Sequence, residues 1–126
     1  MSVILDASAA LALFLREPGS DKVAAIMSDA SISSVNMAEV YTKCVEKDLD
    51  VDGARRLFAG LSVRILPFDD GHAFLAGNLR RETRRYGLSL GDRACLATAV
   101  VERLPVMTAD KVWAGLDLGI EIIVIR

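Results

Sequence analysis

Four acidic residues stand at positions from which their carboxylates could meet. Asp6 directly follows a short apolar run, and Asp110 lies shortly after another. Glu39 and Asp92 fall in the opening turns of two predicted helices. In a parallel sheet, strand ends and the starts of the helices that follow them share the edge where ligands bind. We therefore expect the four side chains to project toward one rim.

Each acid also has an interpretation that requires no chemistry. Asp6 and Asp110 are good helix N-caps. Two pairs match the spacing of a capping box, namely Asn36 with Glu39 and Ser89 with Asp92. However, Asp92 shares helical spacing with the apolar Cys95, where a bare carboxylate is costly without a partner. Capping alone therefore does not account for the whole set, and no Lys or Arg is placed in sequence as a partner for Asp6.

Gathered carboxylates repel each other, by roughly 3 kcal/mol for a pair ~5 Å apart at an effective dielectric of about 20. A divalent cation removes that cost, and oxygen-only ligands favour Mg²⁺ or Mn²⁺ over zinc. Such an ion can activate a water and stabilise the charge that builds up during phosphodiester cleavage. The sequence thus indicates a candidate Mg²⁺ site, with Mn²⁺ as a substitute, held by Asp6, Glu39, Asp92 and Asp110.

The composition argues against several other kinds of site. The chain has one histidine, His72, and two distant cysteines, Cys44 and Cys95, so neither a two-histidine metal site nor a disulfide framework is expected. With 15 Lys and Arg against 17 Asp and Glu, the net charge of −2 argues against holding a long nucleic acid by bulk charge. There is no signal-peptide pattern and no apolar stretch of the ~20 residues that a membrane span requires. We expect a cytoplasmic protein without membrane association.

The elements that must position the acids alternate along the chain. Strands are predicted over 3–5, around Ile32, and over 63–66, 106–107 and 120–125. Helices are predicted over 7–15, 21–28, 35–46, 51–59, 71–86 and 90–103, with a helical turn over 110–114. This alternation indicates an α/β fold in which helices cover both faces of a mostly parallel sheet. We expect one domain over residues 1–126.

Four stretches of the sequence carry a resemblance to a known family: Leu5 to Ala9, Ser34 to Val40, Leu88 to Ala99, and Thr108 to Asp110 with Trp113. In this order they are similar to the motifs of PIN-domain ribonucleases, and specifically of VapC-type toxins of toxin–antitoxin pairs. The resemblance covers essentially the whole chain. It implies a PIN-like three-layer α/β/α fold and a Mg²⁺-dependent endoribonuclease whose acidic set is Asp6, Glu39, Asp92 and Asp110.

The resemblance also implies partners and supporting residues. Ser8 and Thr108 match family hydroxyls near the metal, although local backbone capping explains them equally well. A homodimer, or a hetero-oligomer with a cognate antitoxin whose C-terminal segment occupies the active-site groove, is implied as well. Asp69 and Asp70 follow a predicted strand and should lie near the same rim, but capping is the favoured interpretation for both. The RNA target and the number of metal ions stay open.

Five arginines are candidate contacts to RNA phosphates or to the antitoxin: Arg80, Arg81, Arg84, Arg85 and Arg93. The first four could equally form a solvated helix end, and Arg93 could form an ion pair at the rim. His72 is predicted to be an exposed polar residue without a catalytic role. Cys44 and Cys95 are predicted to behave as small hydrophobic residues, and Trp113 and Tyr41 as core or interface anchors.

Two other functions are compatible with an α/β domain of this size. A phospho-accepting receiver domain also uses Mg²⁺ and aspartates, but it would require adjacent acids after the first strand, where Asp6 is followed by Ala7. A catalytically inactive interaction scaffold is the other alternative, and the retention of all four acids argues against it.

Overall fold

The structure is a computed structural model that describes residues 2–126. The strands are β1 (Val3–Leu5), β2 (Ala30–Ser33), β3 (Arg64–Leu66), β4 (Val106–Thr108) and β5 (Ile122–Val124). The α-helices are α1 (Ala7–Leu15), α2 (Ser20–Ala24), α3 (Ser34–Glu46), α4 (Val51–Gly60), α5 (Asp70–Asn78), α6 (Arg80–Thr83) and α7 (Leu90–Glu102). Short 3₁₀ turns are η1 (Met27–Asp29), η2 (Arg84–Tyr86) and η3 (Lys111–Gly115).

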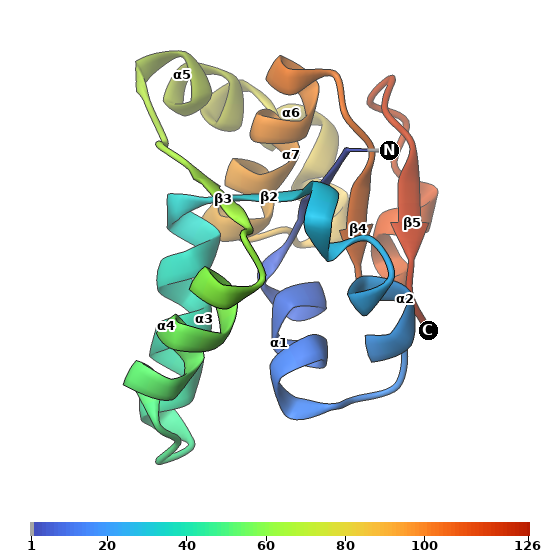
Figure 1. Ribbon diagram of the computed structural model, residues 1–126. Helices are drawn as coiled ribbons and strands as arrows, with labels where there is room; N and C mark the ends of the chain where they lie inside the picture. The colour runs from blue at the N-terminus through green and yellow to red at the C-terminus, as the bar shows by residue number, and fades with distance from the viewer. Residues whose placement is uncertain (1) are drawn as a thin grey trace.

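The strands form one parallel sheet in the order β3-β2-β1-β4-β5 (Figure 1). This confirms the predicted fold class. The order also differs from the 2-1-3-4-5 order of receiver domains, so that alternative is wrong. The chain leaves the central strand β1 toward β2 and later returns to its other side with β4. The switch point, where ligands bind in open α/β sheets, therefore lies between β1 and β4.

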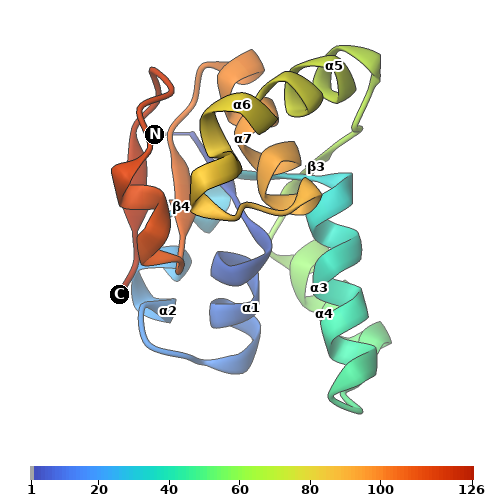
Figure 2. The same ribbon diagram turned by 180° about the vertical axis from the view of Figure 1, so that it is seen from behind.

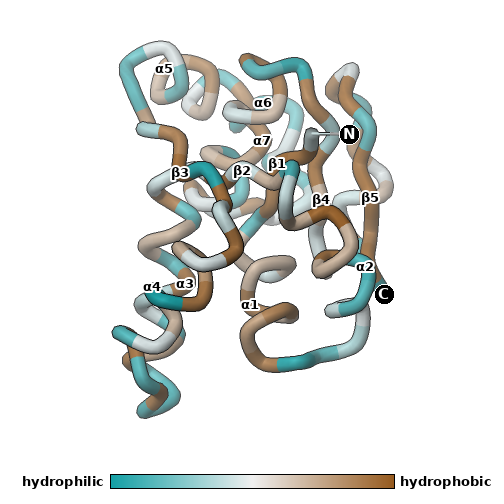
Figure 3. Tube along the Cα trace, viewed as in Figure 1, coloured by the Kyte–Doolittle hydropathy of each residue, from teal (hydrophilic) through white to brown (hydrophobic). Residues whose placement is uncertain are grey.

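Two apolar cores lie on opposite faces of the sheet, because successive strand residues point to opposite sides. Val3 and Leu5 pack into a core shared with α1, α2, α3 and α4, whereas Ile4 packs into a second core with α5 and α7. Figures 1 and 2 show these two helix groups on either side of the strands. Figure 3 shows how hydrophobic residues concentrate in β5 and α1. The predicted three-layer architecture is thus present.

Two predicted helices are shorter than expected. The helix predicted over 71–86 is interrupted after Asn78 and continues as α6 and η2. Gly77 and Asn78 are weak helix formers, and the hydroxyl of Thr83 donates to the carbonyl of Leu79, a bond that bends helices. The helix predicted over 21–28 ends at Ala24, since Ile26 has left the helical region at φ −115° and ψ 7°.

The environment of most singled-out side chains is as predicted, with one exception. Trp113, Cys44 and Cys95 are fully buried. His72 is also buried, at 5% exposure, so the prediction of an exposed polar residue is wrong. Its ring packs near that of Phe68, with the ring centroids 6.0 Å apart, because it lies on the inward face of α5. None of the helices in residues 2–126 is long and apolar enough to cross a membrane.

Candidate active site

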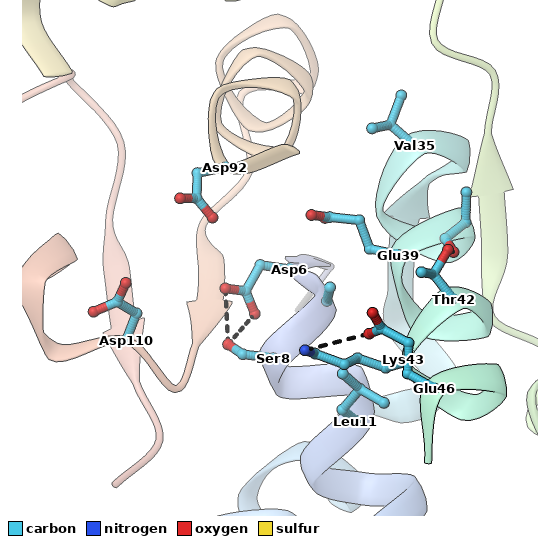
Figure 4. Close-up of a pocket in the computed structure, with 12 residues that line it drawn as sticks. Asp6, Ser8, Leu11, Val35, Glu39, Thr42, Lys43, Glu46, Asp92 and Asp110 are labelled. Carbon is cyan, nitrogen blue, oxygen red and sulfur yellow. Dashed lines mark hydrogen bonds and ion pairs between the residues drawn. The ribbon is translucent and has the colours of Figure 1, made fainter. Parts of the chain in front are cut away.

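The four acids surround one cleft at the carboxyl end of the sheet (Figure 4). Asp6 follows β1, Asp110 follows β4, Glu39 comes from α3 and Asp92 from the first turn of α7. The cleft has a volume of about 610 Å³. In Figure 4 the side chains of Glu39 and Asp92 point toward each other and toward Asp6, with Asp110 on the opposite side from Glu39.

Asp6 is the most buried of the four, at 4% exposure, and it has three hydrogen-bond donors. Its Oδ1 accepts the backbone N–H of Ala9 at 2.8 Å, which caps α1. The hydroxyl of Thr108 donates to Oδ2 at 2.6 Å, and that of Ser8 lies 2.7 and 2.8 Å from the two oxygens. The carboxylate of Asp6 therefore both caps α1 and lines the cleft.

Burial raises the pKa of Asp6 from 3.8 to about 6. Desolvation is the main cause, and the nearby charge of Asp92 adds to it. The bonds from Thr108, Ala9 and Ser8 act in the opposite direction, because they stabilise the ionised form. Asp6 is thus mainly ionised at pH 7, and its charge is held without a basic partner.

Ser8 and Thr108 connect Asp6 to the segment that carries Asp110. The Ser8 hydroxyl oxygen accepts the N–H of Ala109 at 2.9 Å, and that of Thr108 accepts the N–H of Asp110 at 3.0 Å. Each hydroxyl therefore accepts from the turn after β4 and donates to Asp6. The bonds to the backbone fit the capping interpretation, and the bonds to Asp6 place both hydroxyls within the acidic site. Their role beside a metal stays a prediction.

Asp92 and Asp110 also combine a capping bond with a place in the cleft. Asp92 completes a capping box, in which its Oδ2 accepts the N–H of Ser89 at 2.9 Å and the Ser89 hydroxyl accepts the N–H of Asp92. Asp110 caps η3 by accepting the N–H of Val112 at 3.0 Å. The predicted capping box at Ser89 is confirmed.

The second predicted capping box is wrong. The N-cap of α3 is Ser33, which places Asn36 inside the helix. The amide of Asn36 instead donates to the Oε1 of Glu39 at 2.8 Å and to the backbone carbonyl of Gly91 at 2.9 Å. The sequence spacing of Asn36 and Glu39 signalled the first of these contacts, but nothing local signalled the second.

The electrostatics of the cleft are strongly negative. The pKa of the Cys95 thiol is raised well above 9.0, by burial first and then by the charges of Asp6, Asp92 and Glu39, so all three carboxylates lie near this buried thiol. Among residues 2–126, Lys43 is the only cationic side chain lining the cleft, and it forms an ion pair with Glu46 at 3.5 Å.

The donors present fit a hard divalent cation. The candidate ligand atoms are carboxylate oxygens, and none of the residues lining the cleft is a cysteine or histidine. In the described part of the chain, no three acidic, cysteine or histidine side chains are close enough to form a ready-made cage. Mg²⁺ keeps several waters and binds through few carboxylates, so its binding does not require such a cage.

The remaining candidate residues lie outside this cleft. Arg93 donates to the carbonyl of Ala76 at 2.9 Å, and Arg80 donates to that of Leu88 at 3.4 Å. Arg81, Arg84 and Arg85 are exposed on α6 and η2, with Arg85 stacked on Tyr86. Asp69 caps α5, and Asp70 is an exposed residue in its first turn. Both follow β3, at the sheet edge, two strands away from β1.

A comparison with models of protein families shows which family has this fold. The PIN-domain family model matches residues 3–117, which include strands β1 to β4 and all four acids described above. The chain belongs to the PIN-domain family. Comparison with curated protein sequences gives no match, so the assignment rests on the family model and on the fold.

Several solved structures of similar fold come from toxin–antitoxin systems. A DNA-bound VapBC complex from Salmonella typhimurium is 22% identical, with a TM-score of 0.74 over 97% of this PIN domain and 96% of that chain. A toxin–antitoxin complex from Klebsiella pneumoniae is 25% identical, with a TM-score of 0.70 over 94% and 95%. A VapC toxin of Mycobacterium tuberculosis that cleaves the sarcin–ricin loop is 14% identical, with a TM-score of 0.69 over 92% and 97%.

Proposed function

We propose that this PIN domain is a Mg²⁺-dependent endoribonuclease and the toxin of a toxin–antitoxin pair. The observation that carries the proposal is the cleft that Asp6, Glu39, Asp92 and Asp110 line together at the switch point of the sheet. Carboxylates gathered in one cleft repel each other, and a bound cation would offset that repulsion. The one lysine lining the cleft in residues 2–126 is already paired with Glu46.

The residues of the cleft would have different roles in the reaction. A bound Mg²⁺ supplies positive charge that activates a water and stabilises the charge developing on the scissile phosphate. Asp6, with three hydrogen-bond donors, is the most extensively hydrogen-bonded carboxylate of the set. Glu39 and Asp92 face it from α3 and α7, and Asp110 lies on the other side of Asp6, in the segment after β4. Ser8 and Thr108 hold Asp6 in its ionised form.

The toxin assignment rests on the fold relatives. Structures from Salmonella typhimurium and Klebsiella pneumoniae are complexes with an antitoxin, and the toxin of Mycobacterium tuberculosis cleaves the sarcin–ricin loop. By analogy, this chain would act on RNA and be restrained by a cognate antitoxin that covers the cleft. A homodimer, or a hetero-oligomer with the antitoxin, would be the resting assembly.

The proposal is tested by incubating the purified protein with structured RNA. We expect cleavage with Mg²⁺ or Mn²⁺, none in excess EDTA, and loss of most activity in Asp6→Asn. The matched control is Asp69→Asn, which also removes a helix-capping carboxylate but lies outside the cleft. Undiminished cleavage in EDTA would overturn the metal mechanism. Metal binding without any cleavage would favour the inactive scaffold.

A further inference from the structure

Asn36 is a buried amide beside one of the four acids. Its side chain is 1% exposed, and both of its N–H groups are used. One donates to the Oε1 of Glu39 at 2.8 Å, and the other donates to the carbonyl of Gly91 at 2.9 Å. Asn36 and Glu39 belong to α3, whereas Gly91 belongs to α7. The amide therefore ties Glu39 to the helix that carries Asp92.

Gly91 provides the space for this arrangement. A Cβ atom at Gly91 would lie 2.3 Å from the Oε2 of Glu39 and 2.5 Å from its Cδ, far inside contact distance. The carboxylate thus rests directly on the backbone of α7, one residue before Asp92. Any larger residue at position 91 would push the carboxylate away. We refer to Asn36 and Gly91 together as the Glu39 clamp.

The Glu39 clamp leaves a buried polar atom unpaired, which a contact that only packed α3 against α7 would avoid. The Oδ1 of Asn36 is buried without a hydrogen-bond partner in the described part of the chain. A buried polar atom left unpaired generally costs stability and calls for a functional explanation. An apolar residue of similar size would pack α3 against α7 without that cost, but it would leave Glu39 free to rotate.

We propose that Asn36 is a positioning residue that fixes the Glu39 carboxylate for the metal, with Gly91 providing the space it occupies. The inference rests on the proposed metal-dependent function and deepens it. Partners that orient a ligating carboxylate generally contribute 10- to 100-fold to metal affinity, so the clamp should set both metal affinity and turnover.

The first test measures Mn²⁺ affinity by calorimetry, without RNA. Asn36→Leu should weaken binding by roughly 10-fold or more. The matched control, Asn78→Leu, removes an amide that bonds only to a backbone carbonyl of α5 and should bind Mn²⁺ as the parent does. In a Glu39→Gln background, Asn36→Leu should have no further effect, because it acts through Glu39. Additive losses would overturn the proposal.

A second variant separates positioning from folding. Gly91→Ala replaces a helical glycine, and the atoms it displaces are the flexible end of the Glu39 side chain. Its melting temperature should match or exceed that of the parent. Mn²⁺ affinity and kcat should nevertheless fall, while KM for RNA stays close to that of the parent. A stable Gly91→Ala with parental Mn²⁺ affinity would overturn the proposal.

The outcomes also distinguish this inference from the proposed function. If the parent binds Mn²⁺ and cleaves RNA while both variants bind Mn²⁺ normally, the positioning role is wrong and the ribonuclease remains. If the parent binds no Mn²⁺ at all, both are wrong. If both variants lose Mn²⁺ affinity as expected but the parent does not cleave RNA, the clamp positions a metal ligand in a protein with another activity.

Discussion

Three carboxylates in this PIN domain both cap a helix and line the acidic cleft, although the sequence presents capping and metal binding as alternatives. A carboxylate has about four lone-pair sites, so one capping bond leaves room for another ligand. Asp92 engages Oδ2 in its capping box and Asp110 engages Oδ1 at η3. Asp6 is bonded at both oxygens, yet it lines the same cleft. Asp6, Asp92 and Asp110 are therefore both helix caps and candidate metal ligands, whereas Glu39 is a candidate ligand that caps nothing.

The pH dependence of stability should identify Asp6 directly. Its pKa of about 6 in the folded protein exceeds the ordinary value of 3.8, so in metal-free protein its contribution is most favourable below pH 4 and is lost as the pH rises through 6. Relative to Asp6→Asn, the parent should lose on the order of 2–3 kcal/mol of unfolding free energy between pH 4 and 7. Urea denaturation in EDTA measures this. A difference that does not vary with pH would contradict it.

The sequence predicted the shared position of the four acids at one cleft, because the signal for each of them was local. The four acids could be proposed because each stands at a predicted strand end or helix start. Asn36 could not, because its second partner, the carbonyl of Gly91, is 55 positions away and is a backbone atom with no sequence signature. The burial of His72 was missed for a related reason, since the face that α5 turns inward is decided by packing against neighbouring elements.

At the scale of elements, the order of strands and helices was predictable and the interruption of the long helix was not. Alternating apolar runs indicated every strand, with bounds close to those observed. The break after Asn78 depends on weak helix formers that many helices tolerate, and on the bond from Thr83 to Leu79. The break matters because it divides the four arginines between α6 and η2.

These arginines give an element-scale prediction. Arg81 and Arg85 line a hollow beside Tyr86 and the segment after η3. If they grip RNA phosphates, changing both to Gln should weaken binding and lower the slope of log affinity against log salt by roughly 1–2. Changing Arg55 and Arg56 on α4 removes the same charge and serves as the control. Equal effects of the two pairs would favour the solvated-helix interpretation.

Substitutions at two glycines with positive φ can test how closely the start of α2 packs against the residue that follows β5. Gly19 has φ +94°, and a Cβ there would lie 2.7 Å from the backbone oxygen of Ile125. Gly119 has φ +76°, but a Cβ there would meet nothing within 4 Å. Gly119→Ala should cost about 1–2 kcal/mol, the strain of the left-handed region alone. Gly19→Ala should cost clearly more in thermal melts, and equal losses would contradict the contact.

For the whole molecule, the strand order explains why residues from distant segments meet. Because β1 lies between β2 and β4, the segments that follow β1, β2 and β4 all open onto one edge, and α7 adds Asp92 from the other face. The sequence allowed this convergence to be predicted from the alternation of elements. It did not allow the side-chain directions or the depth of the cleft to be predicted, since both depend on how α3 packs against α7.

The stability of the whole molecule should report the repulsion among the acids and its relief by metal. Without metal, Asp92→Asn removes one charge from the cleft and keeps an oxygen for the capping bond, so the variant should be at least as stable as the parent. Its loss of a charge at a helix start, generally worth ~0.3–1 kcal/mol, acts in the opposite direction but should not dominate. Millimolar Mg²⁺ should raise the melting temperature of the parent by mass action and that of the variant much less. If the acids were caps alone, the variant would be less stable, and Mg²⁺ would move neither melting curve.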